Sequence, residues 1–240
     1  MPQQGQHRMA RPRERSCRAF VCALLAVMAC RGEIIDRVAV AIGDYQVITE
    51  SAILREIRFT AFQNREPADF GGPSKRAAAE RLVERGLILK EIEISRYPAA
   101  PDEDIEQMFR DTISGYPNEA AFRAALAKYG ISEKALRAHL TRQLQIVRFI
   151  DYRFRPGVQI KEEDIREYYR REVLPKIAFA GKGPPPSIAP TVEVPVEARN
   201  KIERLLAAEE SDRLLEVWLQ ETRARTRIEY REGAFLGEAP

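Results

Sequence analysis

The chain has 240 residues, 45% hydrophobic and 31% charged, which is enough to bury one large core or two small ones. Its formal net charge is +3, but the first 30 residues hold five Arg and one Glu, and the remaining residues carry 34 basic and 35 acidic side chains. That balance excludes the basic surface expected of a nucleic-acid-binding protein. The cysteines, Cys17, Cys22 and Cys30, leave residues from 31 onward without a disulfide, a thiol nucleophile or a cysteine metal ligand.

Residues 1–29 have the pattern of a secretory signal peptide, with an Arg-rich start followed by the apolar run Ala19 to Ala29. This run is too short to span a bilayer. Two kinds of processing stay open. Val27 and Ala29 suit cleavage after Ala29, whereas Met28-Ala29-Cys30 suits a lipoprotein signal in which an acylated Cys30 tethers the protein to the membrane. Both predict an exported, periplasmic protein.

A β-hairpin is expected directly after the leader. Val38, Val40 and Ile42 alternate with small residues, Gly43-Asp44 is a two-residue turn signal, and Thr49 can cap a helix that runs to about Phe62. A hairpin alone is only marginally stable in water, so it needs a further strand or a covering helix.

The other strand candidate is Thr226 to Tyr230, in which Thr226, Ile228 and Tyr230 alternate with charged residues. If this strand pairs with the hairpin, the two ends of the chain meet in one sheet and the residues between them belong to a single domain. The predicted fold class is therefore mainly α with a small antiparallel β-sheet, closed by the N-terminal hairpin and the C-terminal strand.

Apolar periodicity and cap signals predict helices through the middle of the chain. Their expected spans are Ser74–Ser95, 102–112, 118–129, 132–154, 161–169 and Val196–Arg223. Residues 33–173 would form a helical domain, and 196–231 a helix and strand that complete it. The Pro-rich segment 174–195 predicts a linker without regular structure, and 232–240 a frayed tail from Gly233 onward.

Few residues suit catalysis. His139 can be read as a pH sensor or ligand, but a lone histidine among Arg137, Leu140 and Arg142 is typical of a helix surface or a satisfied, partly buried site. The acidic run 162–164 can be read as a metal cluster, but it better suits the first turn of a helix. The sequence has no phosphate-binding loop and no His placed for a triad. We therefore expect no enzyme activity, no metal site and no cofactor.

The order of parts resembles the SurA family of periplasmic chaperones. Asp36 to Ser51 is similar to the family's opening strand pair and helix cap, and Phe122–Gly130 followed by Ile131–Arg137 is similar to its paired helices. Ile160 to Tyr169 and Leu214 to Ile228 are similar to the helix before the isomerase insert and to the closing helix and strand. The resemblance implies a helical chaperone core.

The sequence departs from that family in one respect. Its members usually carry one or two parvulin domains, each of roughly 90 to 100 residues, where this chain has only Glu172 to Pro195. Parvulin chemistry also relies on a pair of buried histidines, and this chain has only His7 and His139. The prediction is a parvulin-less chaperone without prolyl isomerase activity.

The resemblance implies an ATP-independent holdase that binds unfolded or nascent envelope polypeptides, including outer-membrane proteins, and has no small-molecule substrate. Apolar candidates for a peptide groove, which equally suit a packed core, are Met108, Phe109, Tyr116, Phe122, Phe149 and Tyr152. The alternative is an assembly subunit on the same scaffold, with 174–195 as an arm that docks one dedicated partner. A domain-swapped homodimer is a further option, because the last helix and strand follow a Pro-rich arm.

Overall fold

A computed structural model describes residues 36–179 and 193–235. The chain divides into Met1–Asp36 and Arg37–Pro240, and the described helices and strands belong to the second unit. Its strands are β1 (Val38–Ile42), β2 (Gln46–Thr49) and β3 (Ile228–Tyr230). The longer helices are α2 (Glu50–Asn64), α3 (Gly72–Ser95), α4 (Asp102–Ser114), α5 (Glu119–Tyr129), α6 (Glu133–Phe154) and α9 (Val196–Arg225). Shorter elements are η2 (Arg155–Gly157), α7 (Glu162–Tyr168), η3 (Tyr169–Val173), α8 (Leu174–Phe179) and η4 (Glu232–Ala234).

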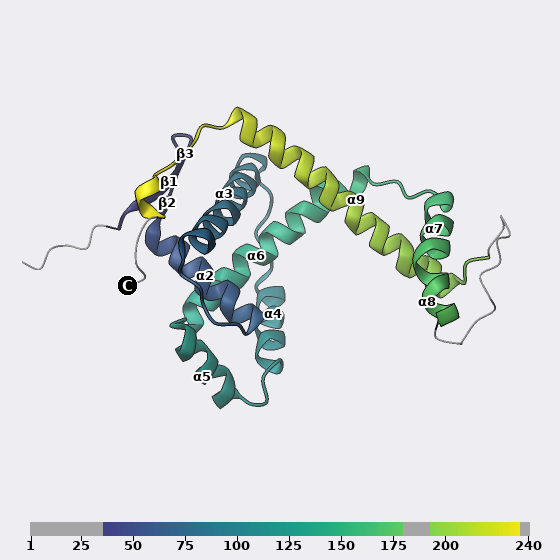
Figure 1. The fold of residues 1–240 in the computed structure, drawn as a ribbon, viewed down its shortest axis with the longest axis horizontal. Coiled ribbons are helices and arrows are strands. Elements are labelled where there is room, and N and C mark those ends of the chain that lie inside the picture. The colour runs from purple at the N-terminus through teal and green to yellow at the C-terminus, as the bar shows by residue number, and fades with distance from the viewer. Residues whose placement is uncertain (1–35, 180–192, 236–240) are drawn as a thin grey trace, which may run out of the picture. The chain divides into compact units, whose positions relative to one another are not determined.

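The two ends of the unit meet in one antiparallel sheet with the strand order β2-β1-β3. Val40 of the central strand faces Ile48 on one side and Tyr230 on the other. Figure 1 shows β3, at the yellow end of the chain, against β1, at the purple end. Gly43 turns the hairpin with a φ of 53°, a left-handed conformation that favours glycine. The predicted fold class, mainly α with a sheet that joins the two ends, is confirmed.

The sheet packs on α2, α3, α6 and α9 to form the main core, which we call the sheet core. The Thr49 side chain accepts a hydrogen bond from Ala52 N at 3.4 Å and starts α2 as predicted. Gly86 of α3 lies so close to the hairpin that a Cβ there would be 2.6 Å from Gln46 Oε1. The buried members of the sheet core are Ala39, Val40, Ile42, Ile48, Ile53, Ile57, Ala78, Ala79, Val83, Leu87, Ile88, Ile92, Phe149, Leu219, Ala234 and Phe235.

A second core lies where α4 and α5 meet α2 and α6, and we call it the aromatic core. Asn118 and Ser132 cap α5 and α6 through their side chains, and Gly130 ends α5 with a φ of 64°. Its buried members are Phe59, Ala61, Phe62, Phe109, Phe122, Leu126, Tyr129, Ile131, Leu136 and Leu140.

The third core is small and lies between the α7-η3-α8 segment and the first half of α9. Its buried residues are Ile165, Tyr169, Val194 and Ile202. Arg199 joins the two sides by donating from both guanidinium Nη atoms to Glu162, with Nη2 2.6 Å from Oε1. We call this cluster the α7–α9 core.

Two predictions about irregular segments are wrong in part. The stretch from 174 onward was expected to hold no regular element, but α8 occupies Leu174–Phe179. Pro175 lies just beyond Tyr169–Val173, where the hydrogen bonding is of the π type, so its missing N–H falls at an existing irregularity of the helical segment. Residues 180–192 of the expected linker lie outside the described residues.

The expected fraying from Gly233 is also wrong for 233–235. Ala234 and Phe235 are 1% and 7% exposed, and the guanidinium of Arg76 lies 4.5 Å from the centre of the Phe235 ring. Arg37 Nη1 donates to the Gly233 carbonyl oxygen at 3.0 Å. This segment therefore extends the closure of the sheet beyond β3.

Candidate functional site

The structure separates the six residues predicted for a peptide groove. Phe109 and Phe122 are buried in the aromatic core, with Met108 and Tyr116 partly buried against it. Phe149 belongs to the sheet core and is 1% exposed.

Tyr152 stands apart from the other five candidates because it is 66% exposed and its ring lies 5.1 Å from that of Tyr97. The lipidation candidate Cys30 lies outside the described residues. The six aromatic and methionine side chains therefore do not line one open surface.

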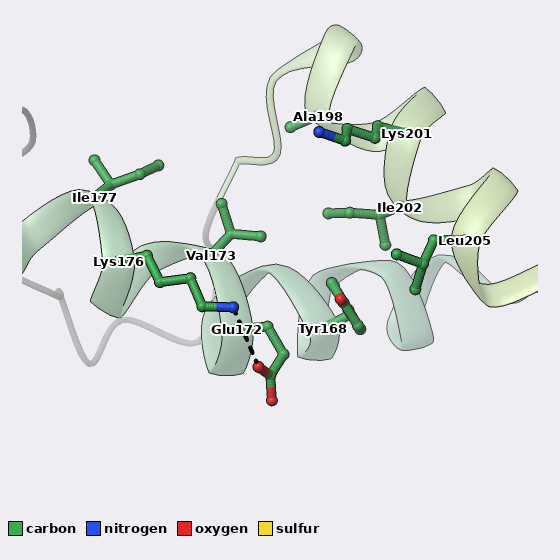
Figure 2. A pocket seen from close by; sticks show the side chains of 9 residues that line it. All are labelled: Tyr168, Glu172, Val173, Lys176, Ile177, Ala198, Lys201, Ile202 and Leu205. Atoms are coloured by element: carbon green, nitrogen blue, oxygen red, sulfur yellow. Dashed lines mark ion pairs between the residues drawn. The ribbon is translucent and has the colours of Figure 1, made fainter. Parts of the chain in front are cut away.

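An apolar cleft lies elsewhere, above the α7–α9 core, and encloses about 480 Å³. Figure 2 shows its two walls: Val173 and Ile177 project from η3 and α8 on one side, and Ala198, Ile202 and Leu205 from α9 on the other. Leu205 is 36% exposed, whereas Ile202, at 4%, forms the floor. The cleft is therefore an extension of the α7–α9 core. None of the described residues covers it.

The local fold explains why apolar side chains gather there. Ile165, Tyr169, Val173 and Ile177 recur at every fourth residue and so follow one side of a continuous helical segment. Hydrogen bonding changes to the π type over Tyr169–Val173, a pattern that is frequent at functional sites. Sequence reasoning missed this wall because the prolines after Leu174 suggested a linker. The period of four residues was the signal that could have revealed it.

Charged groups stand at the rim of the cleft. Lys176 Nζ lies 3.7 Å from Glu172 Oε2, an ion pair drawn in Figure 2. Lys201 also lines the cleft, and among the described residues it has no ion pair. Long lysine side chains can lie along apolar surface while their ammonium groups reach water. The arrangement suits an apolar ligand segment flanked by backbone carbonyls or by acidic side chains.

His139 is buried, at 6% exposure, and stacks on Phe59 with 4.2 Å between ring centres. Burial lowers the pKa of His139 from 6.5 to about 4, since the attraction of Glu56 is opposed by Arg85 and Arg142. The ring is therefore neutral at pH 7. The structure therefore supports the interpretation of His139 as a packed, buried residue and not the interpretation of it as an exposed ligand.

The acidic run at the start of α7 has structural partners. Glu162 pairs with Arg199 and Arg166, and the Asp164 carboxylate accepts a hydrogen bond from Lys161 N at 3.0 Å. Across residues 36–179 and 193–235, no group of three or more His, Cys, Asp or Glu side chains is placed to hold a metal ion. Within the same residues, no helix has the length and apolar character required to cross a membrane.

Comparison with known proteins identifies no family. No family model matches the chain, and no curated protein matches it in sequence. One solved structure that it resembles comes from work on PEB4 and Cj1289, two structurally related SurA-like chaperones of Campylobacter jejuni. The two chains share 11% identity with a TM-score of 0.47, over 82% of this chain and 99% of the other. This structural neighbour is a SurA-like chaperone, at a level of similarity too low to decide function.

Proposed function

We propose that the protein is an exported, ATP-independent holdase that binds apolar segments of unfolded envelope polypeptides, and that the cleft between α7-η3-α8 and α9 is its binding site. The observation that carries the proposal is the open apolar cleft itself. Its volume, about 480 Å³, falls within the usual range of ligand pockets, and its walls are mostly aliphatic. The sequence resemblance to the SurA family and the signal-peptide pattern support the same function.

The energetics suit a holdase that releases its clients without ATP. Burying one Leu- or Val-sized side chain contributes roughly 1.5 to 3 kcal/mol. Two such side chains in the cleft contribute about 3 to 6 kcal/mol, which corresponds to dissociation constants from several millimolar to tens of micromolar before the ordering costs of association, and those costs weaken the binding further. Binding of that strength slows aggregation but still allows a folding client to leave.

The residues that line the cleft can contact client segments of many different sequences. Val173, Ile177 and Leu205 offer branched aliphatic groups, which accept any apolar side chain of similar size. Lys176 and Lys201 add flexible donors at the rim instead of a fixed polar recognition pattern. Such a surface favours unfolded segments in general over one defined ligand.

The proposed organisation places the leader at 1–29, the helical domain at 33–173 and the closing helix and strand at 196–231. The segment 174–195 would stand where relatives carry parvulin domains, with α8 as one wall of the cleft. Prolyl isomerase activity is not part of the proposal. In a proline-peptide isomerisation assay we expect the uncatalysed rate, and clear catalysis would contradict that expectation.

The test is suppression of aggregation of an unfolded porin by the mature protein. The double variant Ile177→Gln/Leu205→Gln places polar groups on both walls of the cleft. Its control, Val147→Gln/Val217→Gln, changes two aliphatic residues that are 51% and 43% exposed and lie outside the cleft. We expect suppression by the wild type and the control, and at least a several-fold weaker effect of the cleft variant.

Two results would count against the proposal. Absence of suppression by the wild type at several-fold excess would contradict the holdase function, and equal loss in both double variants would contradict the assignment of the cleft. A pull-down from an envelope extract separates the holdase from the alternative assembly subunit. A broad set of unfolded clients supports the holdase, whereas one stoichiometric partner supports the subunit.

A further inference from the structure

A second, smaller cavity of about 160 Å³ lies where β2, α2, α3 and α6 meet. Its lining differs from that of the apolar cleft, because three arginines and one glutamate face it together with a glutamine and the buried His139. The lining residues are Gln46, Ala52, Arg55, Glu56, Phe59, Leu82, Arg85, Gly86, Leu89, His139 and Arg142. With His139 neutral, the charged groups that line the cavity sum to +2.

The one acidic group is already neutralised by the protein. Glu56 is 5% exposed, and Arg85 donates to it twice, from Nη1 to Oε2 at 2.8 Å and from Nη2 to Oε1 at 2.9 Å. Arg81 Nε lies a further 3.7 Å from Glu56 Oε1. The charge of this buried carboxylate is therefore balanced first by Arg85, and no hydrogen bond joins it to Arg55 or Arg142.

Arg55 of α2 and Arg142 of α6 also line the cavity, and both are exposed. Among the described residues neither side chain has a hydrogen bond or an ion pair. Burial, followed by the nearby positive charges of Arg85 and Arg55, lowers the pKa of Arg142, and the attraction of Glu56 only partly opposes this. Two guanidinium groups that line one cavity without a hydrogen-bonded acidic partner provide donors and positive charge that an anion can share.

The walls of the cavity are fixed by packing. A Cβ at Gly86 would come within 2.6 Å of Gln46 Oε1 and 3.0 Å of Ile42 Cδ1, so the absence of a side chain at Gly86 leaves the Gln46 amide room in the cavity. The stacked rings of Phe59 and His139 also line the cavity, and both residues are buried. The buried part of the lining is thus held by packing, while the exposed guanidinium groups of Arg55 and Arg142 can adjust to a ligand.

We propose that this cavity binds a small oxyanion, the phosphate or carboxylate group of a ligand, between the guanidinium groups of Arg55 and Arg142. Guanidinium groups bind both kinds of oxyanion through paired N–H donors. The cavity is smaller than pockets for drug-sized ligands, which begin at about 300 Å³, so it holds a free small anion or a single anionic group. The proposal is independent of the holdase function, because the cavity lies in the sheet-bearing part of the fold and shares no residue with the cleft.

The experiment is thermal unfolding of the mature protein in buffers of constant ionic strength, with sodium chloride replaced stepwise by sodium phosphate or by sodium acetate. Wild-type protein should show a saturable rise in Tm with at least one of the two anions. In Arg55→Gln/Arg142→Gln that rise should be lost, while the Tm in chloride alone stays equal or increases because repulsion has been removed. The single variant Arg55→Gln should bind at least several-fold more weakly.

The control is Lys134→Gln/Arg170→Gln, which removes two exposed cations outside the cavity and should keep the wild-type rise. Vesicles containing phosphatidylglycerol, compared with phosphatidylcholine vesicles, show whether the phosphate of a lipid headgroup also reaches the site. A shift with phosphate, acetate or the headgroup that only the cavity variants lose supports the proposal. No saturable shift with any of the three, or the same shift in the cavity variant as in the control, overturns it.

Discussion

The sheet core and the α7–α9 core use apolar side chains in different ways. Among residues 36–179 and 193–235, the sheet core buries sixteen residues and draws on both ends of the unit, whereas the α7–α9 core buries four. Beside the smaller core, Val173, Ile177 and Leu205 line an open cleft. In the part of the chain that the structure describes, the same kinds of residue therefore complete a closed interior in one region and leave apolar surface accessible in the other.

The comparison assigns most of the stability of the fold to the sheet core and the proposed binding to the region of the α7–α9 core. A core that joins residues far apart in the chain stabilises the whole fold, since its loss releases every element that packs on it. A small core between neighbouring helices can open locally at lower cost, and binding segments are commonly drawn from such regions. The proposed function therefore depends on the less complete of the two cores.

Removing residues after Arg223 should have the largest effect. The truncation deletes β3 together with Ala234 and Phe235, and it leaves β1 unpaired on one edge. The buried Phe235 contributes roughly 1.5 to 3 kcal/mol. Its loss adds to that of the partly buried Ile228 and Tyr230 and of the hydrogen bonds between β1 and β3, so the total is a large share of the stability of a typical domain. Urea unfolding followed by circular dichroism should show no cooperative transition or a greatly weakened one. A truncated protein that melts like the intact one would refute the role of the sheet as the closure of the fold.

A matched pair of core variants compares the two regions directly. Ile53→Ala in the sheet core should lower the global free energy of unfolding by about 2 to 5 kcal/mol, because Ile53 is fully buried. Ile202→Ala should destabilise mainly the α7–α9 region, and its effect on the global urea transition should be smaller. Equal shifts of that transition in the two variants would show that the regions unfold as one unit.

The pKa of His139 predicts an acid sensitivity of the body that holds the sheet and aromatic cores. The folded pKa of about 4 lies below the ordinary 6.5, so the unfolded state binds more protons between these values. The stability due to the neutral ring is complete above pH 6.5 and is lost as the pH falls toward 4, at up to about 1.4 kcal/mol per pH unit. His139→Phe keeps a ring against Phe59 and should flatten this part of the stability profile by about 2 kcal/mol between pH 6.5 and 4.5. An unchanged profile would contradict the buried, neutral state of His139.

The smallest effect on stability is expected for the cleft variant Ile177→Gln/Leu205→Gln. Both side chains retain contact with water, so each polar replacement should change the free energy of unfolding by about 0.5 kcal/mol, and the pair by about 1 kcal/mol or less. The urea midpoint should stay close to that of the wild type while client binding falls. A loss of several kcal/mol would mean that the cleft walls belong to the closed core.

Much of the fold was accessible from the sequence because local signals and tertiary packing agree. Thr49, Asn118 and Ser132 cap helices as their side chains predict, and the alternation of Ile228 and Tyr230 matches their place in the sheet. The helix at Leu174–Phe179 was missed because Pro175 and the prolines after it outweigh a short apolar pattern. Residues 233–235 were missed because the burial of Ala234 and Phe235 depends on α3 and β1, which lie far away in the sequence.

The candidate site was less accessible for a related reason. An aromatic residue such as Phe109 or Phe149 has the same periodicity whether it lines a groove or fills a core, and only the packing of other helices decides between them. The arginine cavity could not be predicted, because Arg55 and Arg142 are 87 positions apart and resemble ordinary exposed residues. Their convergence results from the packing of α2 and α6 around the cavity.

Amide hydrogen exchange with and without an unfolded porin tests the central claim most directly, since it reports on both regions in one experiment. In the free protein we expect slow exchange in β1 and α3 and faster exchange in α7 and α8. On addition of the porin, new protection should appear in residues 165–177 and 198–206, with little change in β1 and α3. Protection confined to α4 and α5, or no protection at saturating porin, would contradict binding in the cleft.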